Sequence, residues 1–338
     1  MPDKNTIIEE VNKLVPEVRA ISDKIFNWAE LGSQEVKSST LLMKTLSDAG
    51  FKVTGDLKAP EDLIPGGVAA TAFRAELGGA SDGPTVVIMI EYDALPIGHA
   101  CGHNLITASG LVAALALARH MGSLPGKLVV MGTPHEEGGS KGAGKIALLE
   151  GGHFKDSDVV LITHPDDRWC LDQRTLSSKM ADFVYHGVTS HAAMAPEKGV
   201  NALNAARLAM DGVDMLRQHL HDDVRVHGVI PQGGQRTNIT PDEVVLLFQV
   251  RALSTARMQD TYKKVVNCAR AGELATGARL EFKEPRTFLK STIPVPEYIE
   301  LVHNALLEAG VNENVIMESK AFGSSDLGNV GNEHQFSR

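Results

Sequence analysis

A short stretch of the sequence places a thiol and an imidazole side by side in front of an apolar segment. Within residues 91–104, Cys101 and His103 are separated only by Gly102, and the helical pattern of residues 105–120 follows. A thiolate and an imidazole two residues apart can point at one metal ion, and Gly102 allows a close approach of the backbone. Taken alone, the pair is equally consistent with a buried cysteine beside a helix-capping loop.

Two further clusters could complete such a site. Glu136 and Glu137 are adjacent in a Pro/Gly-containing turn, and His164 stands between Thr163 and Pro165. Adjacent carboxylates repel, so a fold tolerates them in solvent or at a cation. Side chains that are neighbours on a turn point in different directions, so one could bind metal while the other faces a substrate, as metal-assisted hydrolysis requires. The simpler interpretations are a solvated acidic turn and an ordinary loop histidine.

Each of these three clusters follows a predicted buried strand. The strands are residues 85–90, 128–132 and 158–162, and helical patterns alternate with them. This alternation predicts an α/β fold with a mostly parallel sheet and helices on both faces. Ligands of such sheets bind beyond the carboxyl ends of the strands, so the clusters are expected to meet there. A set of Cys, His, Glu and His suits zinc.

The pattern changes near residue 177 and predicts two domains. Residues 177–285 read as β-α-β-β-α-β, a ferredoxin-like unit inserted into the first domain. Residues 1–176 and 286–338 form the predicted catalytic domain, which carries the three clusters. At the N-terminus, residues 6–30 predict one or two amphipathic helices, with Pro16 opening a fresh first turn.

The bulk properties exclude several classes of protein. The chain has 338 residues and a net charge of −9, with no basic stretch, which argues against nucleic acid or an anionic membrane as partner. It has no run of about 18 apolar residues and no signal-peptide pattern. The three cysteines are widely spaced and odd in number, which favours a reducing compartment and a cytoplasmic location.

Four segments together resemble the motifs of the aminoacylase-like zinc peptidases and amidohydrolases. They are residues 91–104, 132–139, 190–203 and 237–241. The family includes aminoacylases, carnosine-type dipeptidases and hydrolases of indole-acetyl and p-aminobenzoyl-glutamate conjugates. The sequence looks most like the aminoacylase-1-like branch associated with β-alanyl-lysine-type dipeptides, and the resemblance covers nearly the whole chain.

The resemblance implies a metal centre with two zinc ions per subunit, or other divalent metals in their place. Cys101, His103, Glu137 and His164 match its metal ligands. Glu136 matches the general base that acts on a metal-activated water. The implied reaction is hydrolysis of the amide bond in small N-acyl amino acids or dipeptides.

The resemblance also implies roles for residues outside that centre. Asp93 matches a residue that orients a ligand imidazole. His191 and Asn238 match lid residues that stabilise the oxyanion, and the histidine commonly comes from the partner subunit of a homodimer formed through the lid. Arg251 matches an arginine that binds a free carboxylate of the substrate. Read without the resemblance, His191 and Asn238 are ordinary polar residues of turns, and Arg251 is a cation at a strand edge.

One feature departs from the family pattern. The family's last metal ligand is a histidine well beyond the loop at residues 323–326, and this sequence offers only His334, whose surroundings do not match. The resemblance therefore predicts a C-terminally truncated chain that lacks one ligand. The alternative function is that of an inactive homologue that binds or oligomerises without catalysis, and a further alternative is a carboxypeptidase acting on longer peptides.

Overall fold

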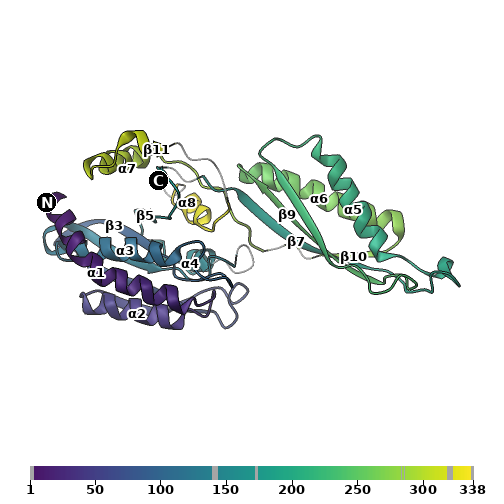
Figure 1. Ribbon diagram of the computed structural model, residues 1–338, viewed down its shortest axis with the longest axis horizontal. Coiled ribbons are helices and arrows are strands. Elements are labelled where there is room, and N and C mark those ends of the chain that lie inside the picture. The colour runs from purple at the N-terminus through teal and green to yellow at the C-terminus, as the bar shows by residue number, and fades with distance from the viewer. Residues whose placement is uncertain are drawn as a thin grey trace. The chain divides into compact units, whose positions relative to one another are not determined.

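The computed structural model describes residues 4–138, 144–171, 174–282, 284, 286–317 and 323–335 (Figure 1). The chain forms two compact units: unit 1 contains Met1–Leu171, Pro296–Glu318 and Asn329–Arg338, and unit 2 contains Asp172–Val295 and Ser319–Gly328. Unit 2 extends past residues 177–285 on both sides because the flanking segments bond to each other. The backbone N–H of Thr175 donates to Thr292 Oγ1 at 2.9 Å, and the backbone N–H of Thr292 donates to Thr175 Oγ1 at 3.3 Å.

Unit 1 is built on a mixed five-stranded sheet. Its helices and strands are α1 (Lys4–Trp28), α2 (Val36–Asp48), β1 (Lys52–Lys58), β2 (Val68–Gly78), β3 (Ser81–Ile90), α3 (His103–Ala118), η1 (Met121–Ser123), β4 (Pro125–Gly132), α4 (Gly144–Glu150), β5 (Val159–Leu161), β6 (Trp169–Cys170), α7 (Pro296–Glu308), η4 (Glu313–Val315) and β11 (Ile316–Met317). The last helix, α8 (Leu327–Gln335), begins in unit 2 and continues in unit 1 from Asn329. The strand order is β1-β2-β4-β3-β5. β3 is parallel to β4 and β5, whereas β1 and β2 run antiparallel. The predicted α/β class is confirmed. Within this sheet, parallel pairing is confined to β4-β3-β5, and β6 and β11 form a separate parallel pair.

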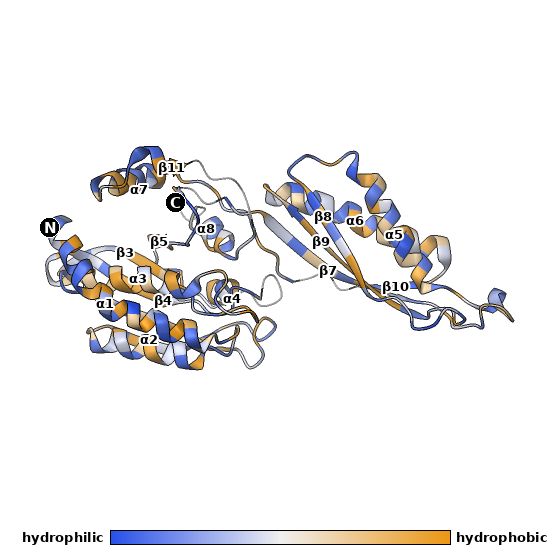
Figure 2. Cartoon of the chain, viewed as in Figure 1, coloured by the Kyte–Doolittle hydropathy of each residue, from blue (hydrophilic) through white to orange (hydrophobic). Residues whose placement is uncertain are grey.

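Both faces of the central strands are buried, which explains their continuous apolar sequences. On one face, residues such as Ile88 and Val130 belong to a core cluster shared with α1, α2 and α3. The alternate residues Val87, Met89 and Val129 are also at most 1% exposed. Figure 2 accordingly colours much of β3 and α3 orange.

Pro16 does not begin a new helix, contrary to the prediction. α1 continues through it as one helix of 25 residues. A proline inside a helix removes one hydrogen bond and crowds the preceding turn. The stripe of Leu14, Val18, Ile21 and Ile25 is buried at 0–6% exposure on both sides of Pro16, and this burial favours a continuous helix.

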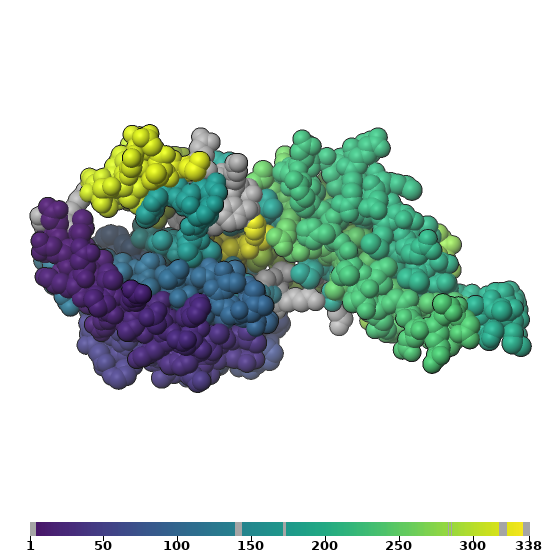
Figure 3. Space-filling view, in the orientation of Figure 1, coloured from purple at the N-terminus to yellow at the C-terminus, as the bar shows by residue number. Residues whose placement is uncertain are grey.

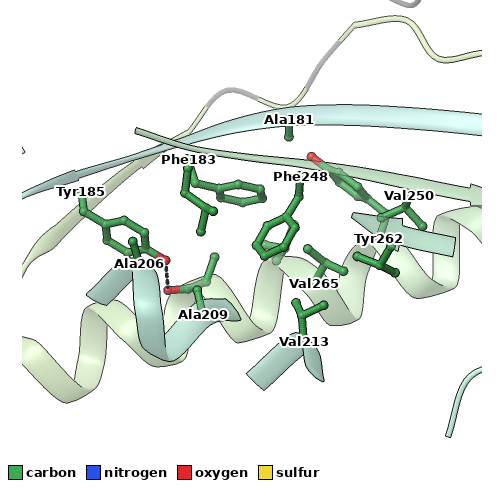
Figure 4. Close-up of a cluster of buried hydrophobic side chains, with 14 of the residues drawn as sticks. Ala181, Phe183, Tyr185, Ala206, Ala209, Val213, Phe248, Val250, Tyr262 and Val265 are labelled. Carbon is green, nitrogen blue, oxygen red and sulfur yellow. Dashed lines mark hydrogen bonds between the residues drawn. The ribbon is translucent and has the colours of Figure 1, made fainter. Parts of the chain in front are cut away.

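Unit 2 has the predicted β-α-β-β-α-β order. Its elements are β7 (Ser177–His186), η3 (Pro196–Lys198), α5 (Ala202–Arg217), β8 (Arg225–Gln232), β9 (Glu243–Ala252), α6 (Thr255–Thr276) and β10 (Arg279–Phe282). The sheet order is β10-β7-β9-β8, with every neighbouring pair antiparallel. Both helices pack on one face of the sheet, around Phe183 and Phe248 (Figure 4). In this core the Tyr185 hydroxyl donates to the carbonyl of Ala269 at 2.8 Å.

Candidate metal centre and active site

The three clusters meet at one edge of the unit 1 sheet. The segment with Cys101 and His103 follows β3, Glu136 and Glu137 follow β4, and His164 follows β5. Since β3, β4 and β5 are parallel, their carboxyl ends lie at the same edge. Residues far apart in the sequence are thereby brought together.

Two groups of potential metal ligands result, and His103 belongs to both. One group is Cys101, His103 and Glu137, and the other is Glu91, His103 and His164; in each, the ligand atoms lie within 4.8 Å of one another. All four side chains singled out as ligands are therefore in the cluster. Glu91 is an addition that the sequence did not single out as a ligand.

Asp93 fixes the orientation of the His103 ring. His103 Nδ1 lies 3.0 Å from Asp93 Oδ1 and 2.9 Å from the Asp93 carbonyl oxygen. Both partners are hydrogen-bond acceptors, so Nδ1 carries the hydrogen. The lone pair on Nε2 therefore faces the other candidate metal ligands. The second oxygen of Asp93 accepts a hydrogen bond of 3.0 Å from the Glu137 backbone. Asp93 thus holds His103 and Glu137 in one arrangement.

The electrostatics of the cluster favour bound positive charge. Burial lowers the pKa of His103, but its bond to Asp93 and the charges of Glu91, Asp93 and Glu136 raise it overall, to about 9. Burial, a hydrogen bond to Glu137 and the nearby carboxylates raise the pKa of Cys101 to about 12. The neighbouring carboxylates contribute to both shifts, so a bound cation would replace these protons.

The donor set fits a divalent metal of borderline softness. It combines one sulfur, imidazole nitrogens and carboxylate oxygens, which together suit zinc. His164 Nδ1 bonds to the carbonyl of Pro165 at 2.9 Å, which leaves its Nε2 free to bind metal. The buried Oε2 of Glu91 makes no hydrogen bond with any described residue, as expected for an atom whose partner is an ion.

Gly102 allows the loop between β3 and α3 to pack against the segment that carries His164. Its φ is +75°, and a Cβ there would lie 2.8 Å from Pro165 Cγ. A side chain at this position would both strain the backbone and push the two loops apart. The predicted close backbone approach at Gly102 is observed.

Gly102→Ala is expected to destabilise the protein by about 2 kcal/mol, the upper end of the usual cost of a left-handed L-residue. Urea unfolding measures the change as a shift of the midpoint. Gly122→Ala is the matched control, because a Cβ there meets no described atom within 4 Å. Equal midpoints for the two variants would show that the loop does not need this glycine.

The turn that carries Glu136 is held by residues that the sequence analysis missed. His135 has a φ of +62°, its N–H donates to Glu35 Oε1 at 2.9 Å, and its Nδ1 lies 2.8 Å from Ser33 Oγ. Burial raises the pKa of Glu35 to about 7. Glu136 itself is half-buried, and its charge acts on Cys101 and His103. The sequence shows Glu35 only as an acidic residue just before a helix, which did not indicate that it supports this turn.

Lys145 is a second residue that was missed. Its side chain is fully buried, and its Nζ lies 2.7 Å from Glu91 Oε1. The available signal was a lysine between Gly144 and the apolar residues 146–149, a segment that is otherwise suited to burial.

One other histidine near the predicted motifs, His99, is not among the candidate ligands. The His99 ring is buried, bonds to the carbonyl of Ile25 at 3.2 Å and stacks on Phe26. It therefore has a packing role. The side chain of His334 lies outside the part of the chain whose side chains are described.

The lid residues His191 and Asn238 occupy neighbouring loops of unit 2. His191 pairs with Ile239 in an isolated bridge, and the Ala192 N–H donates to the carbonyl of Asn238 at 3.1 Å. Ser190 and Thr240 join the loops through a 2.8 Å hydroxyl contact. Residues 188–199 form the projecting teal tip of unit 2 in Figure 3.

Arg251 lies at the other end of β9 from these loops. It is half-buried, and its Nη2 donates to Gln249 Oε1 at 3.3 Å. Its Nε is buried without a hydrogen-bond partner among the described residues. Burial lowers the pKa of Arg251, and among the described residues no carboxylate opposes that effect. The guanidinium therefore has donors available for an anion.

The chain is similar to a peptidase family and to two hydrolases of known name. The model of peptidase family M20/M25/M40 matches residues 88–336. The chain is 39% identical to a Xaa-Arg dipeptidase of Mus musculus, over 97% of this chain and 77% of that protein. It is 29% identical to one of the p-aminobenzoyl-glutamate hydrolase polypeptides of Escherichia coli (strain K12), over 87% of this chain and 62% of that protein.

Solved structures share the fold at lower identity. An aminobenzoyl-glutamate utilization protein from Klebsiella pneumoniae has a TM-score of 0.77 at 20% identity, covering 97% of this chain and 90% of that one. A dinuclear metal-binding peptidase of the M20 family from Bacillus subtilis has a TM-score of 0.72 at 19% identity, covering 95% and 87%. With the matched family model and the 39% identical relative, the chain belongs to peptidase family M20/M25/M40.

Proposed function

We propose that this protein is a zinc-dependent hydrolase of the amide bond in dipeptides or small N-acyl amino acids. The observation that carries the proposal is the convergence of Cys101, His103, Glu137 and His164 at one sheet edge, with Glu136 beside them. Membership of a peptidase family supports a hydrolase over a non-catalytic binding protein.

The chemistry divides between the metal and the side chains. We assign Cys101, His103, Glu137 and His164 as ligands of two zinc ions. When bound, the ions supply Lewis acidity, which makes water a stronger nucleophile and polarises the scissile carbonyl. Glu136 accepts the proton that the attacking water loses and transfers it to the amine nitrogen as the C–N bond breaks. The products are a carboxylate and a free amine.

The lid residues act on the substrate. His191 and Asn238 donate hydrogen bonds to the carbonyl oxygen as it becomes negative. Arg251 binds the free carboxylate, and its buried, unpaired Nε supports this assignment. A substrate with a free carboxylate agrees with the names of the relatives, a Xaa-Arg dipeptidase and a p-aminobenzoyl-glutamate hydrolase.

Arg251→Met is expected to raise KM for a dipeptide at least about 10-fold, because a hydrogen bond to a charged group contributes about 1.5–3 kcal/mol. The same variant should barely change KM for the C-terminally amidated dipeptide, which has no carboxylate to lose. Steady-state kinetics with the two substrates measure the difference. An equal rise of KM for both substrates would show that Arg251 does not bind the substrate carboxylate.

The length of β9 supports a homodimer. The strand has ten residues, so about 30 Å separate its ends. Asn238 and His191 lie beyond its first residue and Arg251 is next to its last. A dipeptide is much shorter than this strand, so His191 and Arg251 of one copy do not reach the same substrate. We therefore assign the oxyanion donors to a partner subunit, with the lids forming the contact.

A cytoplasmic location is proposed from the thiols. All three cysteines are free, and a reducing compartment keeps them so. Among the described helices, none combines the length and apolar composition needed to cross a bilayer.

A substrate panel tests the proposed function. The purified, zinc-loaded protein is assayed on Xaa-Arg dipeptides, β-alanyl-lysine, N-acetyl amino acids and peptides of five or more residues. We expect hydrolysis of at least one dipeptide or N-acyl amino acid and none of the longer peptides. Preferential cleavage of longer peptides would favour a carboxypeptidase, and no hydrolysis of any member would favour a binding protein.

A further inference from the structure

A buried ion pair adjoins the candidate metal centre. Glu91 is the first residue after β3, its side chain is 3% exposed, and Lys145 of α4 is fully buried. Lys145 Nζ lies 2.7 Å from Glu91 Oε1. Apolar side chains of similar volume usually stabilise a fold as well as a buried ion pair does. Stability alone therefore does not explain why this pair is placed here.

The two oxygens of Glu91 have different surroundings. Oε1 contacts the ammonium of Lys145, whereas Oε2 is buried and makes no hydrogen bond with a described residue. Oε2 lies 3.4 Å from His103 Nε2. Two ligand atoms on a tetrahedral zinc with bonds of about 2.0–2.1 Å are about 3.4 Å apart. Oε2 and Nε2 thus have the separation of two ligands of one ion.

His103 can bind only one ion, and Glu91 lies next to the nitrogen that would bind it. Asp93 occupies Nδ1, so Nε2 is the only nitrogen of this ring that can bind metal. Around Nε2 lie Glu91 Oε2 at 3.4 Å and Glu137 Oε1 at 3.8 Å. Two carboxylate oxygens therefore lie within 3.8 Å of the nitrogen through which His103 would bind an ion.

We propose that Glu91 is a metal ligand in addition to the four side chains assigned above, and that Lys145 is a positioning residue that fixes Glu91 through Oε1. The inference rests on the proposed function only in requiring that a metal binds. Because Lys145 neutralises the charge of Glu91, the pair adds a ligand oxygen without adding net negative charge to an already acidic site.

Zinc affinity tests the role of Glu91 without reference to activity. In a competition titration against a chromophoric chelator, Glu91→Gln should raise the zinc Kd at least about 10-fold, in line with losses seen when metal-supporting side chains are removed. Glu61→Gln, at an exposed position of unit 1, is the matched control and should leave Kd unchanged. A Kd for Glu91→Gln within twofold of wild type overturns the proposal.

A double variant separates loss of a metal ligand from misfolding caused by an unpaired buried lysine. Glu91→Gln leaves Lys145 buried without its partner, whereas Glu91→Gln combined with Lys145→Met removes both charges and avoids that cost. The double variant should show the same loss of zinc affinity, and wild-type affinity there also overturns the ligand role.

Cobalt spectroscopy tests the role of Lys145, because the visible absorption of Co²⁺ depends on its ligands. Lys145→Met should change the spectrum in the same way as Glu91→Gln, and Lys145→Arg should restore the wild-type spectrum. A wild-type spectrum for Lys145→Met refutes the positioning role. Failure of wild-type protein to bind Zn²⁺ or Co²⁺ would instead contradict the proposed function, so the two failures are distinguishable.

Discussion

Glu136→Gln is expected to lower kcat for dipeptide hydrolysis by about 10²–10⁴-fold, the usual contribution of a general acid–base group. Glutamine has nearly the same shape as glutamate but does not accept the proton of the attacking water. Glu136 neighbours Glu137 on the turn held by Glu35 and Asp93, and neither of those contacts involves the Glu136 side chain. The zinc content should therefore stay at the wild-type level.

The measurement pairs steady-state kinetics with elemental analysis of the same preparation. Glu61→Gln serves as the control for an acid-to-amide change on the surface of unit 1 and should keep wild-type kcat. Full turnover by the Glu136→Gln variant would show that Glu136 is not the general base. Loss of zinc together with activity would show instead that Glu136 is a metal ligand.

His103→Ala is expected to have the largest effect on metal binding, because His103 Nε2 lies within 3.8 Å of a carboxylate oxygen from each group of potential ligands. Elemental analysis after dialysis should find zinc well below the wild-type stoichiometry. The variant should also lose about 3 kcal/mol of stability, since Asp93 is 1% exposed and would lose its buried partner.

A second variant separates metal loss from folding. His103→Gln keeps an amide N–H that can reach Asp93, so it should unfold at a higher urea concentration than His103→Ala while still losing zinc. His219→Ala, at an exposed position of unit 2, is the control for removal of an imidazole. Wild-type zinc content in both His103 variants would place the metal elsewhere.

The sequence predicted the parts of the site that depend on strand order. Continuous apolar strands indicated parallel pairing, and parallel pairing requires that residues following β3, β4 and β5 meet at one edge. Cys101, His103, Glu137 and His164 are together for this reason. The family and the hydrolase class were also predicted correctly, from four motifs that the chain carries at their expected spacing.

The supporting contacts could not be predicted because they join segments that are distant in the sequence. The bond from the backbone of His135 to Glu35 spans 100 residues. Lys145 and Glu91 are both charged residues, which are rarely buried, so nothing in either local sequence indicated that they pair inside the protein. The continuous helix through Pro16 was missed for a related reason, since the burial of its apolar stripe outweighs a local preference.

Metal-dependent hydrolysis is the central claim, and one reconstitution experiment tests it most directly. The rate of hydrolysis of a Xaa-Arg dipeptide is measured on the purified protein, after removal of metal by a chelator and dialysis, and after addition of Zn²⁺. We predict that activity disappears on chelation and returns with zinc as the ions bind, up to about two per subunit. Hydrolysis that persists in metal-free protein, or no hydrolysis at full zinc occupancy, would contradict the account.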